Sequence, residues 1–140
     1  MNYKFFPDAT TFDPQNAEFK DAAGDVGKEI EDLSKRRPDL YLRVKSFLLN
    51  LLAVTDLLPY LKNGQIYKFP ADKDGLYEMR IPKQARGGVF RIYFCRSIND
   101  LQMLILLCAE LKHKKEPMKI SNAIEKMKQY KDFVKQGVML

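Results

Sequence analysis

The sequence predicts an α+β fold, in which an N-terminal helical hairpin packs on a mostly antiparallel sheet of three or four strands and a C-terminal helix follows. Three observations support this prediction. Apolar residues recur at helical spacing in residues 19–33 and again in residues 40–52. Apolar and polar residues then alternate along residues 76–96, as they do in strands with one covered face. A last apolar stripe at helical spacing follows Pro117.

The first elements are expected to be a short strand over residues 3–6, which ends at Pro7, and a helix that begins at Asp13. Aspartate is a favourable N-cap, and a proline at the next position is tolerated because the first turn of a helix does not need its N–H. The helix should run for roughly twenty residues. Its apolar stripe comprises Phe19, Ala22, Val26, Ile30 and Leu33.

A second helix is expected to begin at Pro38, because the residue that precedes a proline avoids the helical region and so ends the first helix. Its stripe comprises Leu40, Val44, Phe47, Leu48, Leu51 and Leu52. Pro59 should end it. Two amphipathic helices joined by a short turn need an apolar surface to cover, and the strands that follow are the only candidate.

Three strands are expected after a polar loop over residues 62–75. The first two, residues 76–81 and 89–96, form a hairpin with an apolar face made of Tyr77, Met79, Ile81, Phe90, Ile92 and Phe94. The opposite face of this hairpin carries Glu78, Arg80, Arg91, Tyr93 and Cys95. Residues 101–108 form an unbroken apolar run, which suits a central strand that is covered on both faces.

The final helix is expected to begin at Pro117, because the first turn of a helix tolerates a proline. Its buried stripe comprises Ile120, Ala123, Ile124, Met127 and Val134. The chain has 140 residues, of which 46% are apolar and 30% charged, as in an ordinary globular domain. We therefore expect one domain over residues 1–140.

The sequence indicates neither export nor a membrane span. Its N-terminus lacks a basic segment followed by an apolar run, and Asn50, Asp56 and Pro59 interrupt the longest apolar stretch. Cys95 and Cys108 fall in expected strands without a CxxC pattern, which favours reduced core thiols over a metal or redox role. A cytoplasmic protein is the expectation.

The net charge of +6 is unevenly distributed along the chain. Residues 1–34 contain eight acids against three lysines, a net charge of −5, whereas the remainder contains 21 basic and 10 acidic residues, a net charge of +11. The basic part is the one that would contact a nucleic acid. Lysine-rich helix surfaces are also common as solvated faces, so charge alone does not establish such a partner.

Arg80 and Arg91 are the leading candidates for a functional site. They fall on the polar faces of two strands that are expected to pair, so their guanidinium groups should lie close together on a rigid sheet. Like charges tolerate this only if an anion or a carboxylate lies between them, and phosphate is the anion that we expect. The alternative is that Glu78 forms an ion pair with these arginines and the group has no further role.

A second basic cluster, formed by Lys112, His113, Lys114 and Lys115, precedes the final helix. A helix N-terminus attracts phosphate through its free N–H groups, and lysines before it strengthen this field. The neighbouring cations should lower the pKa of His113 and favour a neutral base, although a lone surface histidine is often inert. The sequence contains no catalytic triad, phosphate-binding glycine loop or metal-ligand cluster. Two functions therefore remain for these basic residues: binding of an anion, or phosphoryl transfer by basic side chains without a metal.

Four segments in this order resemble the RelE/HigB toxins of bacterial type II toxin–antitoxin modules, and most of all their HigB-like, phage-derived branch. They are GLYEMRI at residues 75–81, GGVFRIYF at residues 87–94, the lysine cluster that precedes Pro117, and SNAIEKM at residues 121–127. The resemblance covers residues 36–134, which leaves residues 1–34 as an acidic lead-in longer than is usual in the family.

The resemblance implies a RelE-like fold and a ribosome-dependent, metal-free endoribonuclease that cleaves mRNA by attack of a 2′-hydroxyl on the adjacent phosphate. It also implies a cognate antitoxin with a helix-turn-helix, and no membrane partner. The implied catalytic residues are Arg80, Arg91, Lys112, His113 and Lys114. The implied RNA-binding residues are Lys83, Arg86, Lys115 and Lys119.

Two departures from the family pattern leave the general acid and base open. Residues 108–111 precede the first lysine where the family often has a glycine and an aromatic residue, and Ile120 stands where some members have a tyrosine or histidine. A second function is therefore kept beside the first: a ParE-like poison of DNA gyrase, or a catalytically degenerate RelE-fold module that binds a protein. The fold is common to these relatives and does not distinguish them.

Overall fold

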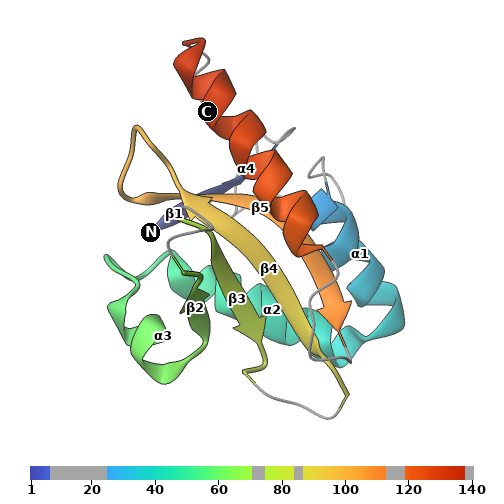
Figure 1. The fold of residues 1–140 in the computed structure, drawn as a ribbon. Coiled ribbons are helices and arrows are strands. Elements are labelled where there is room, and N and C mark those ends of the chain that lie inside the picture. The colour runs from blue at the N-terminus through green and yellow to red at the C-terminus, as the bar shows by residue number, and fades with distance from the viewer. Residues whose placement is uncertain (7–24, 71–74, 84–86, 113–118, 138–140) are drawn as a thin grey trace.

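The computed structural model describes residues 1–6, 25–70, 75–83, 87–112 and 119–137, and Figure 1 shows their arrangement. The strands in these residues are β1 (Asn2–Phe5), β2 (Ile66–Lys68), β3 (Tyr77–Ile81), β4 (Val89–Arg96) and β5 (Met103–Lys112). The helices are α1 (Asp25–Arg36), α2 (Pro38–Leu51), α3 (Leu58–Asn63) and α4 (Ile120–Lys135). The α+β prediction is confirmed.

The strands form one mixed sheet in the order β1-β5-β4-β3-β2. β1 pairs parallel to β5, while β5, β4, β3 and β2 pair antiparallel in succession. β5 has one extra residue, Leu107, because Tyr93 pairs with Cys108 and Phe94 pairs with Leu106. This bulge places Leu107 and Cys108 together in the apolar cluster under α4.

The two faces of the sheet are covered by different helices, with α1 and α2 behind the sheet and α4 in front of it in Figure 1. Phe90, Ile92 and Phe94 are fully buried in the cluster that contains residues of α1 and α2. Tyr93 and Cys95 lie in the second cluster, which contains Ala123, Met127 and Tyr130 of α4. The predicted alternation along residues 76–96 is confirmed, and so is the prediction that the helical hairpin covers the sheet.

The sequence analysis expected the second helix to extend to Pro59, and this prediction is wrong. α2 ends at Leu51, where tighter backbone bonds such as Ala53 N to Asn50 O at 3.1 Å close the last turn. Pro59 instead lies in the first turn of α3, which does not need its N–H. Asp56 Oδ1 accepts a hydrogen bond from Leu58 N at 2.8 Å and so satisfies a free donor at the start of α3.

The expected count of three or four strands was too low, since the sheet has five. Residues 62–75 were expected to be loop throughout, but they contain the end of α3 and the strand β2. Gly64 adopts a left-handed conformation with φ +81°, which ends α3 and turns the chain into β2. β5 also continues beyond Cys108 to Lys112, because its last residues pair with the start of β4, and the polar Glu110 accepts a hydrogen bond from Tyr93.

The predicted start of the first helix at Asp13 lies outside the described residues. The last helix begins later than the predicted Pro117, because Lys119 is its non-helical N-cap. The described helices begin at Asp25 and Ile120. Ala123 and Met127 are buried as predicted, and Tyr130 joins them on the same stripe although the sequence prediction omitted it. In the part of the chain that the structure describes, no helix is long and apolar enough to cross a membrane.

Cys95 and Cys108 are both buried in the sheet, as predicted for core thiols. Both belong to the cluster under α4. Burial raises the pKa of Cys95 from 9.0 to about 12, so this thiol stays protonated and is a poor nucleophile at neutral pH.

Candidate functional site

The hairpin of β3 and β4 brings Arg80 and Arg91 together on one face of the sheet. The two residues are direct cross-strand partners in the register, so their side chains leave the sheet on the same side. Glu78 lies two residues before Arg80 on β3 and therefore shares this face. The sequence prediction that both arginines and Glu78 would meet on one face is confirmed.

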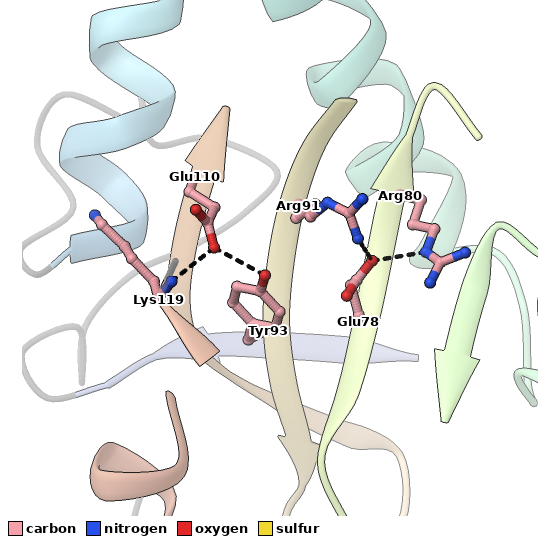
Figure 2. Close-up of polar contacts among 6 residues, drawn as sticks. All are labelled: Glu78, Arg80, Arg91, Tyr93, Glu110 and Lys119. Carbon is pink, nitrogen blue, oxygen red and sulfur yellow. Dashed lines mark hydrogen bonds and ion pairs between the residues drawn. The ribbon is translucent and has the colours of Figure 1, made fainter. Parts of the chain in front are cut away.

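One carboxylate oxygen accepts hydrogen bonds from both arginines. Arg80 Nε donates to Glu78 Oε1 at 2.7 Å, and Arg91 Nη1 donates to the same atom at 2.5 Å. Figure 2 shows the two guanidinium groups approaching Glu78 from opposite sides. Charge-assisted bonds of this kind are the strong ones, so Glu78 fixes the position of both guanidinium groups.

The three charged side chains differ in exposure. The side chain of Glu78 is 1% exposed, that of Arg91 is 13% exposed and that of Arg80 is 34% exposed. Two cations against one carboxylate leave a surplus positive charge at the edge of a low-dielectric region, where an anion is attracted more strongly than in bulk water. The surplus lies on the side that solvent can reach.

One N–H group of Arg91 does not contact Glu78. Its Nε is buried and has no hydrogen-bond partner among the residues that the structure describes. A buried donor without an acceptor costs free energy, and an anion would remove that cost once the side chains around Nε moved to admit it. A guanidinium presents its N–H groups as a planar fork that matches the oxygens of a phosphate. The geometry therefore suits an oxyanion beside Arg91.

A second polar group connects the sheet to the start of α4. Glu110 Oε2 accepts hydrogen bonds from Tyr93 Oη at 2.9 Å and from the backbone N of Lys119 at 2.9 Å (Figure 2). Burial, and then the hydrogen bond to Glu110, raise the pKa of Tyr93 well above its ordinary value of 10.0. The phenol thus remains a donor and holds the carboxylate in place.

Lys119 was predicted to contact RNA, and the structure shows its ammonium group in an ion pair. Lys119 Nζ lies 3.1 Å from Glu29 Oε1 of α1. Figure 2 shows the side chain extending toward that helix and away from Glu78. The structure therefore does not bring this ammonium group together with Arg80 and Arg91.

Lys83 was also predicted to contact RNA, but it lies with α2. Its side chain approaches Gly64, and it lines a hollow between α2 and the end of β3 together with Arg43 and Phe47. Phe47 belongs to the cluster on the α1 and α2 face of the sheet, whereas Arg80 and Arg91 lie on the opposite face. Lys83 is thus separated from the two strand arginines.

The remaining predicted site residues cannot be placed with the arginines. Lys112 ends β5, where its backbone pairs with Val89, and its side chain is not described. His113, Lys114, Lys115 and Arg86 lie outside the described residues. Of the predicted composite site, the structure brings together Arg80 and Arg91.

The sequence analysis missed Tyr67, which lies beside this group on β2. Its backbone pairs with Glu78, and the Arg80 guanidinium carbon lies 4.9 Å from the centre of its ring. The only sequence signal was a short stretch, IYKF at residues 66–69, between glycine and proline. Glu110 was missed because it ends an otherwise apolar run. A single acid at such a position does signal a buried polar contact.

Comparison with known proteins assigns no family to the chain. No protein-family model, no curated protein and no solved structure matches it. In the described ranges, no group of three or more histidine, cysteine, aspartate or glutamate residues is arranged to hold a metal ion. The chemistry of the site rests on the side chains described above.

Proposed function

We propose that the sheet face around Arg80 and Arg91 binds the phosphate backbone of RNA. The observation that carries this proposal is the convergence of two cross-strand arginines on Glu78, with Arg91 Nε buried and without a partner among the described residues. Phosphate contacts to arginine supply most of the affinity for a nucleic acid and make it depend on salt. The surplus of +11 in residues 35–140 favours the same class of partner.

Within this class, the proposal is that the protein is the toxin of a type II toxin–antitoxin module, similar to RelE/HigB toxins. It would act on the ribosome as an endoribonuclease that cleaves mRNA, and a separate helix-turn-helix antitoxin would hold it inactive. The motifs at residues 75–81 and 87–94 support this proposal, since Arg80 and Arg91 fall within the segments that carry the resemblance.

The proposed reaction is an internal transfer of the phosphoryl group. The 2′-oxygen of one nucleotide forms a bond to the adjacent phosphorus, and the bond from phosphorus to the 5′-oxygen of the next nucleotide breaks. The 2′-hydroxyl loses its proton to a base, and the leaving oxygen gains one from an acid. The products are a 2′,3′-cyclic phosphate and a free 5′-hydroxyl.

Arg91 and Arg80 have a definite role in this scheme. The phosphorane-like transition state carries more negative charge on its oxygens than the ground state, and fixed guanidinium groups stabilise it selectively. Glu78 positions both groups before substrate binds and is their resting partner. Lys112, His113 and Lys114 are the residues that the resemblance offers as acid and base.

The decisive experiment is induction of the protein without antitoxin, followed by mapping of transcript ends. Arg91→Ala should lower the rate of transcript cleavage by about 10²-fold or more, since it removes a charge that stabilises the transition state. Growth arrest should then be lost. Arg96→Ala is the matched control: Arg96 lies on the same strand but its guanidinium contacts the ring of Tyr77, which belongs to the opposite apolar cluster. The control should retain cleavage.

A second candidate function is supported by the contact of both arginines with Glu78, which is the arrangement of a structural ion pair. The hollow beside Arg43, Phe47 and Lys83 offers a contact surface for a protein. The alternative is a ParE-like poison of DNA gyrase or a degenerate module that binds a protein. Intact transcripts during growth arrest, together with double-strand breaks in DNA, would favour it over the nuclease.

A further inference from the structure

We infer that Tyr67 and Arg80 form a stacking surface for one nucleobase, next to the phosphate held by Arg80 and Arg91. This inference rests on the proposed function and adds a subsite to it. Tyr67 belongs to the strand that the sequence did not predict, and nothing in the sequence motifs refers to it. The ligand is a base of single-stranded RNA, recognised by its flat face.

The register places the phenol ring beside the arginines. Tyr67 is the cross-strand partner of Glu78, so its side chain leaves the sheet on the face that carries Glu78 and Arg80. The Arg80 guanidinium carbon lies 4.9 Å from the ring centre of Tyr67, within the range of a cation–π contact. Arg80 therefore touches both the carboxylate of Glu78 and the ring of Tyr67.

Both flat groups are held in place and still reach solvent. Phe69 packs against the Tyr67 ring almost perpendicularly, with centroids 5.0 Å apart, and Glu78 fixes Arg80 Nε. Tyr67 is 40% exposed and the Arg80 side chain is 34% exposed. A preordered aromatic ring beside a guanidinium costs little conformational entropy when a base stacks on it.

The position of Tyr67 distinguishes it from an ordinary exposed aromatic residue. Phe133 near the end of α4 is 41% exposed and also contacts one ring, that of Phe6, at 5.6 Å. Phe133 has no cation over its ring among the contacts of the described residues, and Figure 1 shows the C-terminal end of α4 far from β2. Isolated exposed aromatics such as Phe133 are common and need no ligand. The pairing with the proposed phosphate site is what gives Tyr67 a role.

The test compares two short, fluorescently labelled single-stranded oligonucleotides of equal length and charge. One carries all its bases and the other is abasic, and their affinities are measured by fluorescence anisotropy at low salt. The wild-type protein should bind the oligonucleotide with bases about tenfold more tightly, the usual scale for one stacked base. Tyr67→Ala should reduce this preference to about twofold or less and leave the affinity for the abasic strand unchanged.

Two further variants separate stacking from other effects. Tyr67→Phe keeps the ring and should keep the preference, and Phe133→Ala is the matched control and should also keep it. If Tyr67→Ala does not fold, Tyr67→Leu preserves an apolar side chain without a π face and should lose the preference in the same way.

The outcomes distinguish this inference from the proposed function. Equal, salt-dependent binding of both oligonucleotides by the wild type, or an unchanged preference in Tyr67→Ala and Tyr67→Leu, would overturn the stacking surface and leave the phosphate site standing. If the wild type binds neither strand at low salt, the phosphate site fails and the stacking surface fails with it, whereas cleavage on the ribosome is tested separately by the mapping of transcript ends.

Discussion

The two faces of the sheet bury very different chemistry. The face toward α1 and α2 is apolar along β3 and β4, from Met79 to Phe94, and its burial stabilises the fold by roughly 25 cal/mol per Å². The face toward α4 is apolar where that helix covers it, and next to this apolar part it carries a charged group made of Glu78, Arg80 and Arg91. A buried ion pair rarely stabilises a fold more than apolar residues of the same size would. Stability alone therefore does not explain why this face carries a charged group.

The largest effect is expected at the centre of the charged group. Glu78→Leu removes the carboxylate that both arginines contact and leaves Arg91, which is 13% exposed, without its partner. The free energy of unfolding should fall by about 3 kcal/mol, as it does when one member of a buried ion pair is deleted. Denaturant titration measures it.

A double variant then sharpens the comparison between the faces. Glu78→Leu combined with Arg91→Met replaces the buried pair by apolar side chains and should recover most of the lost stability. Under the proposed function, RNA binding should nevertheless weaken strongly, because Arg91 no longer offers its contact to phosphate. If the double variant is as unstable as Glu78→Leu alone, the charged group is needed for the fold and the functional explanation weakens.

A smaller effect is expected at the boundary between the apolar and the charged part of the same face. Tyr93→Phe removes one buried hydrogen bond to Glu110 and should lower the free energy of unfolding by about 1–2 kcal/mol at neutral pH. The pKa of Tyr93 is raised in the folded state, so its contribution is complete below the unfolded value of 10.0 and is lost as the pH rises above it.

This difference in pH dependence can be measured. Denaturant titrations at neutral pH and above pH 10 should show that the wild type loses more stability than Tyr93→Phe over this interval. Equal losses in the two proteins would mean that the phenol is not held protonated by its environment. Comparing the two proteins cancels the other tyrosines.

The β3–β4 hairpin and the helices that cover the sheet could be predicted from the sequence, whereas the edge strand β2 and the contacts between distant residues could not. Alternation along residues 76–96 determines which side chains share a face, so the meeting of Arg80 and Arg91 could be predicted. β2 spans three residues, which is too short for a periodic pattern, and so Tyr67 was missed. The ion pair of Lys119 with Glu29 joins residues that are far apart in the chain. The spacing of apolar and polar residues within one element cannot predict such a contact.

The smallest effect concerns that ion pair, which joins the helices of the two faces. Lys119 at the start of α4 contacts Glu29 of α1, and each side chain is 29% exposed. Such a pair contributes little, so Lys119→Ala and Glu29→Gln should each lower the free energy of unfolding by at most about 0.5 kcal/mol, and less at high salt.

RNA binding by the same two variants tests whether Lys119 belongs to the interface. Since its ammonium group is held by α1, we expect both variants to bind RNA with the wild-type dependence on salt. A direct phosphate contact would instead reduce the salt dependence by about one unit of slope in Lys119→Ala, and releasing the lysine in Glu29→Gln would strengthen binding. Wild-type salt dependence in both variants would confine the proposed RNA-binding surface to the strand arginines and their neighbours. The second pattern would extend that surface across the start of α4, where Lys119 lies.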